Sequence, residues 1–182
     1  MWENTALIVV DVQYGLFIRP TPIYKENELL RNINYLVENA HSAHIPVFFI
    51  QHCSPRLVED SVEWQLHPRL KVDDNDTFIV KKEPNAFKNT NLKKELDTRK
   101  IDHLVIVGIW THNCVQATCR GAKKLGYEVI LVRDGHSRDG PEKLAKKSIE
   151  SWNRRLNEAG VTLKLTDEID FRSRRDSLNN GK

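Results

Sequence analysis

The sequence predicts an α/β protein with three layers, in which a mostly parallel sheet of about six strands lies between helices. Short runs of Val, Ile and Leu alternate along the chain with longer segments of helical periodicity, an order typical of βα units. The runs are nearly continuous in apolar residues, which indicates strands covered on both faces. Right-handed crossovers then place helices on both sides of the sheet.

Six short runs rich in β-branched residues are the expected strands: Leu7–Val10, Val47–Ile50, Phe78–Val80, Leu104–Val107, Val129–Val132 and, with a weaker pattern, Val161–Leu165. Four segments with apolar residues at helical spacing are the expected helices: Glu28–His44, Asn91–Arg99, Cys114–Leu125 and Pro141–Ala159. Thr90 is a candidate N-cap for the second helix. Gly126 and Gly160 suit the left-handed positions that follow the third and fourth helices.

Length and composition indicate one domain, residues 1–171, followed by a basic tail, residues 172–182. The chain has 182 residues, of which 40% are hydrophobic, and this is enough to bury a full core. The formal net charge of +3 resides in the tail, which holds four basic residues and one acidic residue. The tail lacks an apolar pattern, so we expect it to be disordered. The neutral body does not indicate a nucleic-acid surface.

No apolar stretch approaches the roughly 20 residues that a membrane span requires, and the first residues, MWENTALIVVD, lack the features of a signal peptide. The three cysteines, Cys53, Cys114 and Cys119, are an odd number without framework spacing. We therefore expect a reduced, cytoplasmic protein that acts on a small molecule, with no membrane or nucleic-acid partner.

The most informative cysteine is Cys114, in the run LVIVGIWTHNCVQATCRGA, where a strand turns into a helix. A thiol at a helix start faces unpaired N–H groups and the positive end of the helix dipole, so we expect a lowered pKa and a reactive thiolate. The alternative is a buried structural cysteine. The polar turn Thr-His-Asn before Cys114 favours the reactive interpretation, whereas Cys119 lies on another helix face and is a core filler.

Two charged residues end other strands in the same way. Asp11 closes the run ALIVVD and Lys81 closes the run FIVK. Each could merely cap a loop or be solvated, but a charge at the end of an apolar strand must be paired or used. The ends of parallel strands can converge on one crevice, so Asp11, Lys81 and Cys114 are the candidate catalytic residues. Lys82 points to the opposite face and is expected to be solvated.

Two long connections, residues 12–25 and 53–76, leave from the same ends of the expected strands and could build a pocket. The weaker candidates for substrate binding lie in or near these segments: Gln13, Phe17, His52, Trp64, Phe87, Trp110 and His112. Isolated aromatic residues and histidines are more often core or surface residues. There is no HExxH, CxxC, GxGxxG or P-loop motif, so we expect neither a metal nor a cofactor.

Three segments together resemble the isochorismatase-like cysteine hydrolase family: ALIVVDVQYGLF, IVKKEPNAFKNTNL and VIVGIWTHNCVQATCRGAKKLGYEVILVRDG. The likeness covers nearly the whole chain before the tail and implies the Rossmann-like fold of that family. It also implies an Asp–Lys–Cys triad of Asp11, Lys81 and Cys114. By its position relative to Phe87, Lys81 matches the family lysine better than Lys82.

The resemblance further implies a cis peptide bond at Ile109–Trp110 and an oxyanion hole formed by the backbone N–H groups of Trp110 and Cys114. One departure is informative. The metal-binding nicotinamidase branch carries Asp-x-His after the second strand, where this chain has Gln51, His52 and Cys53. A metal-bound nicotinamidase is therefore not expected, and the retained cysteine favours hydrolysis of a carbon–nitrogen bond. The family commonly forms dimers or tetramers, so a homo-oligomer is expected.

The mechanism expected from these residues begins when Asp11 takes the proton of Cys114. The thiolate then attacks an amide carbonyl to form a thioester, and Asp11 protonates the leaving group and later activates water. Two alternatives remain open: a vinyl-ether hydrolase with Asp11 as general acid and no covalent step, and a thiol-based redox or binding module.

Overall fold

Six parallel strands form one sheet in the order β3-β2-β1-β4-β5-β6 in the computed structural model of the chain, which describes residues 2–172. The strands are β1 (Thr5–Val10), β2 (Val47–His52), β3 (Thr77–Lys81), β4 (His103–Ile109), β5 (Glu128–Ser137) and β6 (Thr162–Lys164). All neighbouring strands run parallel. This is the strand order of doubly wound α/β folds, in which the connections reverse direction between β1 and β4. Crevices that bind ligands form at that reversal.

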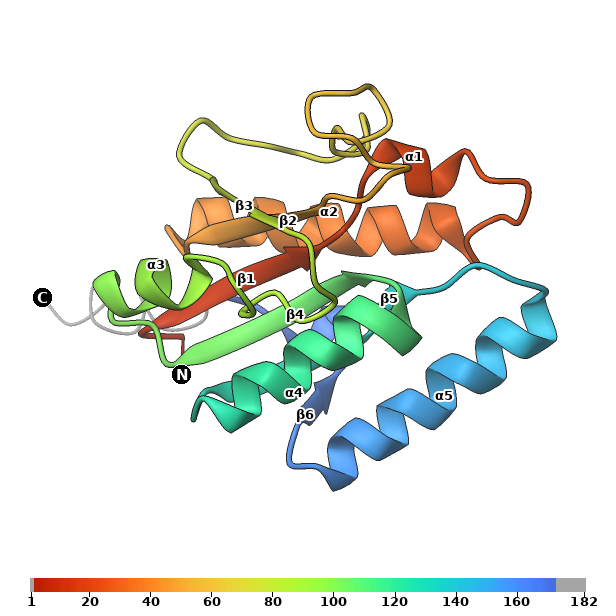
Figure 1. Cartoon of the computed structure of the whole chain (residues 1–182). Coiled ribbons are helices and arrows are strands. Elements are labelled where there is room, and N and C mark those ends of the chain that lie inside the picture. The colour runs from red at the N-terminus through yellow and green to blue at the C-terminus, as the bar shows by residue number, and fades with distance from the viewer. Residues whose placement is uncertain (1, 173–182) are drawn as a thin grey trace, which may run out of the picture.

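The helices are α1 (Tyr14–Phe17), α2 (Glu26–Ser42), α3 (Leu92–Thr98), α4 (Gln116–Lys124) and α5 (Glu142–Glu158). A π-helical turn, η1 (Thr111–Val115), precedes α4, and a 3-10 turn, η2 (Thr166–Glu168), follows β6. Figure 1 shows α2 behind the sheet and α3, α4 and α5 in front of it. None of the described helices combines the length and apolarity that a bilayer crossing requires.

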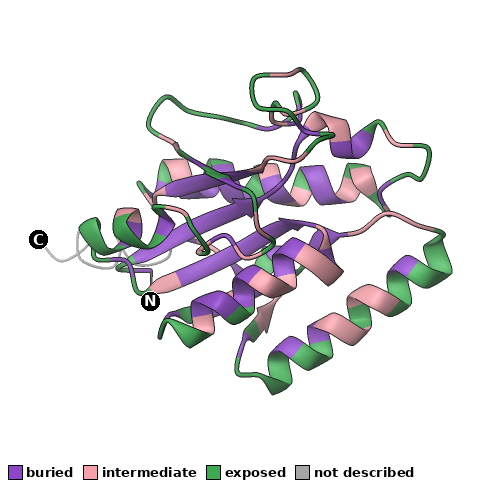
Figure 2. Ribbon diagram, viewed as in Figure 1, coloured by how far each residue is buried: buried purple, intermediate pink, exposed green. Residues whose placement is uncertain are grey.

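Two hydrophobic cores lie on the two faces of the sheet. The apolar stripe of α2, with Leu29, Ile33 and Leu36, packs on one face, and α3, α4 and α5 cover the other face. Every residue of β1 is buried, which explains its unbroken run of apolar residues, and Figure 2 shows the same burial along the central strands. Each fully buried Val, Leu or Ile side chain stabilises the fold by about 1.5–3 kcal/mol.

The predicted fold class is confirmed, and each expected strand and helix has a counterpart in the structure. Three details differ. α1 and η2 were not expected, because turns of three or four residues carry no periodic signal. β5 continues to Ser137, beyond the expected end, through a register shift opposite β4 between Ile106 and Gly108. The tail predicted at 172–182 lies outside the described residues, except for Arg172.

The helix expected to begin at Cys114 begins differently. The polypeptide enters it through η1, so Cys114 is the fourth residue of a π-helical turn, and α4 starts at Gln116. Similarly, Asn91 rather than Thr90 is the N-cap residue of α3. The Thr90 hydroxyl still accepts a hydrogen bond from the N–H of Leu92 at 3.3 Å. It therefore binds the first N–H group of α3, although Thr90 lies one residue before the N-cap.

Gly108 allows β4 to lie close against the end of β1. Its φ is +126°, and a Cβ atom at this position would lie 2.1 Å from the carbonyl oxygen of Val10. Only glycine avoids both the steric contact and the strained backbone. Because Asp11 follows Val10, this close approach sets the position of a candidate site residue.

Candidate active site

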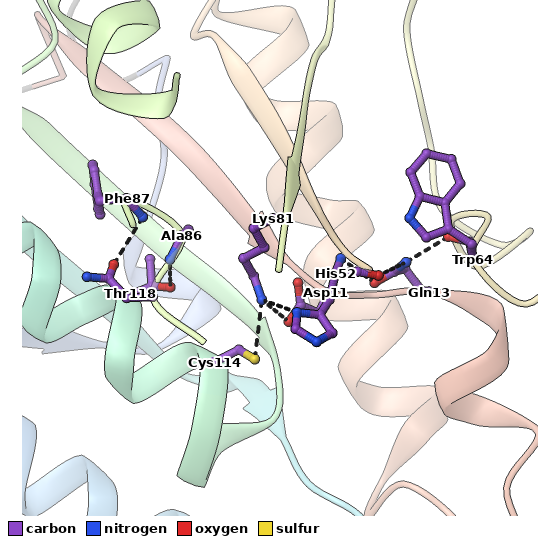
Figure 3. A network of polar contacts seen from close by, with 10 residues as sticks. Asp11, Gln13, His52, Trp64, Lys81, Ala86, Phe87, Cys114 and Thr118 are labelled. Atoms are coloured by element: carbon purple, nitrogen blue, oxygen red, sulfur yellow. Dashed lines mark hydrogen bonds and ion pairs between the residues drawn. The ribbon is translucent and has the colours of Figure 1, made fainter. Parts of the chain in front are cut away.

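Three segments that are far apart in the sequence bring polar side chains around one ammonium group. Lys81 Nζ, at the end of β3, donates hydrogen bonds to Asp11 Oδ2 at 2.8 Å and to Cys114 Sγ at 3.4 Å. Its third close neighbour is His52 Nδ1, at 3.1 Å. Figure 3 shows the side chains of Asp11, His52 and Cys114 converging on Lys81. An ammonium group has three protons and no acceptor, and here each proton has one partner.

Asp11 lies at the reversal point of the sheet, directly after β1. Its N–H donates to the carbonyl of Ile50 at 2.9 Å, which continues the pairing with β2 by one residue. Its φ is +54°, the left-handed region in which Asp is better tolerated than most residues. This conformation turns the chain out of the sheet at Asp11, next to Lys81.

Cys114 is held by the turn η1 and by a buried network behind it. The Trp110 carbonyl accepts hydrogen bonds from the N–H groups of Asn113 at 3.0 Å and Val115 at 3.2 Å. The Ile109–Trp110 peptide bond is cis, at the position for which the family resemblance implied such a bond.

The network begins at Thr111, the first residue of η1. The Thr111 hydroxyl is 2.8 Å from His136 Nδ1, and His136 Nε2 is 2.9 Å from Asn153 Oδ1. Since an amide oxygen only accepts, His136 carries its proton on Nε2 and accepts the Thr111 hydroxyl proton at Nδ1. Complete burial lowers the pKa of His136 to about 4, so the ring is neutral. β5 and α5 thereby fix the start of the turn that carries Cys114.

The expectation of a lowered thiol pKa is wrong. Burial raises the pKa of Cys114 to about 12, and the Asp11 carboxylate adds to this effect, while Lys81 opposes it. Only 5% of Cys114, 2% of Asp11 and 1% of Lys81 is exposed. Within this closed site, desolvation outweighs the helix terminus on which the sequence argument relied. The resting site therefore holds a thiol beside a Lys81–Asp11 ion pair.

One atom of the ion pair has no hydrogen-bond partner. Asp11 Oδ1 is buried, and no described residue donates a hydrogen bond to it. A carboxylate oxygen of Asp11 and the ligand atoms of His52 and Cys114 all lie within 4.8 Å of one another. A buried carboxylate oxygen without a donor is costly unless a proton or a ligand reaches it. Asp11 Oδ1 is therefore an acceptor without a described donor, beside the ion pair.

Asp11, His52 and Cys114 are also the one group of described residues close enough to hold a metal ion. The Lys81 ammonium already lies among their donor atoms, at 2.8 to 3.4 Å. A metal ion would have to displace this ammonium from three hydrogen bonds. Lys81 thus supplies the positive charge that a metal ion would otherwise bring.

Gln13, a candidate for substrate binding, lies fully buried and engages backbone groups. Its Nε2 donates to the carbonyls of His52 at 3.0 Å and Trp64 at 2.8 Å, and its Oε1 accepts from the His52 N–H at 2.8 Å. The residue therefore ties the end of β2 and the long loop, residues 53–76, to the end of β1. Trp64 reaches the site through its backbone carbonyl.

Phe17 is buried in the core on one face of the sheet, and Phe87 packs against the core on the other. Phe17 contacts His67, with ring centroids 4.6 Å apart, and Phe87 stacks on Tyr127 at 5.6 Å. Both residues were candidates for substrate binding, but the ring contacts described for them are with His67 and Tyr127.

Trp110 and His112 form a stacked pair at the start of the turn, with ring centroids 6.2 Å apart. Trp110 Nε1 and His112 Nδ1 are buried without a hydrogen-bond partner among the described residues. The Arg19 guanidinium lies 4.6 Å from the centroid of the Trp110 ring. Sequence reasoning missed Arg19, His136 and Asn153. His136 lies in the polar run RDGHSRD, which gives no sign that its ring is buried.

Comparisons with known proteins identify the family and the fold. The family model described as the isochorismatase domain matches residues 5–162. An uncharacterized isochorismatase family protein of Bacillus subtilis, YddQ, is 29% identical over 72% of this chain and 76% of its own length. A streptothricin hydrolase of Streptomyces noursei is 28% identical over 72% of this chain, which spans 49% of that protein.

Solved structures show the same fold. The crystal structure of an isochorismatase family protein superposes with a TM-score of 0.86 at 29% identity and covers 90% of this chain and 99% of its own. An isochorismatase from Pseudomonas putida has a TM-score of 0.84 at 24% identity, with 91% of this chain and 90% of its own covered. At that identity the second comparison concerns the fold alone.

Proposed function

Since the chain belongs to the isochorismatase family of hydrolases, we propose that it is a cysteine-dependent hydrolase that cleaves the carbon–nitrogen bond of a small non-peptide amide. Cys114 is the proposed nucleophile, and a thioester on its sulfur is the proposed intermediate. The observation that supports this most directly is a protonated thiol whose sulfur lies within 4.8 Å of an oxygen of the Asp11 carboxylate, in which Oδ1 lacks a hydrogen-bond partner.

In this proposal, Asp11 Oδ1 accepts the thiol proton as the sulfur attacks the substrate carbonyl carbon. Lys81 bonds to both the Asp11 carboxylate and the Cys114 sulfur, so it stabilises whichever of them carries the negative charge. The site therefore does not need a thiolate at rest. It requires only that the negative charge can move from the Asp11 carboxylate to the Cys114 sulfur while the Lys81 ammonium group stays bonded to both.

The carbonyl oxygen gains negative charge during the attack. We assign its stabilisation to the backbone N–H groups of Trp110 and Cys114, on the turn that leads into α4. One donor of this kind contributes about 3 kcal/mol to transition-state stabilisation in other enzymes. Water then hydrolyses the thioester, with Asp11 as the base and the sulfur as the leaving group, and the thiol is regenerated.

The amide class is favoured over a vinyl ether because cleavage of a vinyl ether requires an acid but no nucleophile. A nucleophile held 3.4 Å from Lys81 Nζ has a use only if the reaction passes through a covalent step. The homologous streptothricin hydrolase is a reason to include streptothricin among the first compounds assayed.

The test is mass spectrometry of the intact protein after rapid mixing with a library of small amides. Capture of an acyl group on Cys114 in wild-type protein, and its absence in Cys114→Ala, is expected. We expect Cys114→Ala to lose turnover by a factor of at least about 10⁴, as for other covalent catalysts that lose their nucleophile. Full activity in Cys114→Ala would instead select the noncovalent vinyl-ether chemistry.

A further inference from the structure

His52 is the one member of the four-residue cluster that reaches outward. Asp11, Lys81 and Cys114 are buried, whereas His52 is partly exposed. Its backbone is fixed on both sides by Gln13, which accepts from its N–H and donates to its carbonyl. The partly exposed imidazole therefore extends from a rigid strand end and lies next to the ion pair (Figure 3).

The contact with Lys81 determines which nitrogen of His52 carries the proton. Lys81 Nζ is 3.1 Å from His52 Nδ1, and an ammonium group can only donate. His52 Nδ1 is therefore the acceptor, and Nε2 carries the hydrogen. Among the described residues, none forms a hydrogen bond with Nε2. Burial and the Lys81 charge lower the pKa of His52, against a smaller opposing effect of Asp11, so the neutral ring persists at neutral pH.

We propose that His52 is the catalytic group that delivers a proton to the leaving nitrogen, by a relay that runs from the thiol through Asp11 and Lys81. This inference rests on the proposed function and specifies the route that the proton takes. Asp11 collects the proton within the buried part of the site, and His52 releases one at the exposed side.

In each acylation, the relay moves one proton in total from the Cys114 thiol to the leaving nitrogen. The S–H bond of Cys114 breaks, and its proton passes to Asp11 Oδ1 while the sulfur bonds to the carbonyl carbon. As the carbon–nitrogen bond breaks, His52 Nε2–H protonates the nitrogen and Lys81 transfers a proton to His52 Nδ1. Asp11 then returns its proton to Lys81, and exchange with water, which removes the proton from His52 Nδ1 and returns one to Nε2, restores the starting tautomer. The amine departs neutral, and Asp11, Lys81 and His52 regain their starting protonation states.

Two observations favour this route over direct donation by Asp11. The Asp11 side chain is only 3% exposed, so a leaving group at the mouth of the site meets His52 before it meets the carboxyl group. In addition, neutral imidazole is too weak an acid to lose the proton on Nε2 unless Nδ1 gains one at the same time. Lys81 Nζ, 3.1 Å from Nδ1, can supply that proton. Lys81 thereby acts as both the counterion of Asp11 and the proton source for His52.

The experiment measures acylation of Cys114 by four aryl acetates, whose phenols become more basic from 4-nitrophenyl through 4-chlorophenyl and phenyl to 4-methoxyphenyl acetate. 4-Nitrophenolate departs without a proton, whereas phenolate benefits from one. For His52→Gln we expect the loss of burst rate to grow along the series and to be smallest with 4-nitrophenyl acetate. With phenyl acetate we expect a fall of about 10² or more, the usual contribution of a general acid.

His103→Gln is the matched control, since it makes the same replacement at the start of β4, at the opposite end of the sheet. It should leave all four rates unchanged. Equal losses across the series in His52→Gln would show that His52 only positions its neighbours, and this result would overturn the relay. Absence of Cys114 acylation in wild-type protein would instead reject the proposed function.

A second measurement requires no substrate. In ¹⁵N-labelled protein at neutral pH, NMR should show His52 with its proton on Nε2 and a hydrogen-bonded, unprotonated Nδ1. In Lys81→Met, the Nδ1 signal should lose the shift that hydrogen bonding causes. A proton on Nδ1 in the wild-type protein would overturn the proposal, whatever the kinetics show.

Discussion

The thiol of Cys114 holds its proton at rest because it is buried beside a carboxylate. Its pKa is raised to about 12 from an ordinary value of 9.0, and the Lys81 ammonium does not compensate. A reactive cysteine does not have to be a stable thiolate; it needs a base within reach at the moment of attack. The acceptor we propose is Asp11 Oδ1, which is buried and has no described donor.

Alkylation by iodoacetamide checks this directly. The rate at Cys114, followed by peptide mass spectrometry, should still be rising at pH 10, with no plateau near 9. Asp11→Asn should lower the apparent pKa of the thiol, because the carboxylate raises it. Cys53, which is less buried, is the internal reference, and Cys119, which is fully buried, should stay unmodified. A plateau below pH 9 for Cys114 would contradict the raised pKa.

His136 predicts how stability changes with acid. Its pKa is lowered to about 4 from 6.5, so the unfolded chain binds a proton at a pH at which the native protein does not. Stability from this group is present above about pH 6.5 and is lost as the pH falls towards 4. The full difference is about 3 kcal/mol.

Urea unfolding at pH 7 and at about pH 4.5, on wild type and His136→Gln, measures this contribution. Gln can accept from Thr111 and donate to Asn153 but does not titrate, so the variant should lose less stability on acidification than wild type does. The same acid sensitivity in both proteins would show that His136 is not the titrating group.

Among the elements, the contact between β1 and β4 tolerates the least change. Gly108→Ala would place a Cβ 2.1 Å from the Val10 carbonyl oxygen at a φ of +126°, and the strands must separate to accommodate it. We expect a loss of at least about 3 kcal/mol of stability from overpacking and backbone strain together. The displaced Val10 should also move Asp11 and reduce activity in the fraction that folds.

Gly126→Ala is the control for the backbone effect alone. Gly126 follows α4 with a φ of +91°, and no atom lies within 4 Å of the place that an added methyl group would take, so the expected loss is about 1 kcal/mol. Chemical denaturation of the two variants separates the steric cost from the backbone cost. Equal losses would show that the strand contact at Gly108 has no special cost.

At the scale of the whole molecule, the fold class followed from the alternation of apolar runs and helical segments. The sites of Asp11, Lys81 and Cys114 followed from their positions at strand ends. Parallel strands place such ends at one edge of the sheet, so three separate local patterns were enough to indicate one site. The strand order was not predictable in this way, because nothing local to β1 specifies that β2 and β4 are its neighbours.

What sequence reasoning missed depends on packing. The thiol pKa was wrong because the number of atoms that cover Cys114 is a property of the assembled loops and not of the turn that carries it. The partners of His136 lie on η1 and α5, separated by 25 and 17 residues, and no spacing rule connects them. Gln13 was expected to contact substrate, but it binds the backbone carbonyls of His52 and Trp64. This role could not be predicted, because one of the two carbonyls belongs to a loop that only the folded chain brings close.

The burial of Cys114 has a consequence for how well the protein resists oxidation. Peroxides and disulfides attack exposed thiolates, and their reactions are slow with a covered, protonated sulfur. With 5% of Cys114 exposed, the sulfur is dormant towards such reagents until a ligand occupies the site and a base removes its proton. The same burial that keeps the thiol protonated thus protects it from oxidants. A mutation that opened the site to solvent would therefore speed inactivation by oxidation.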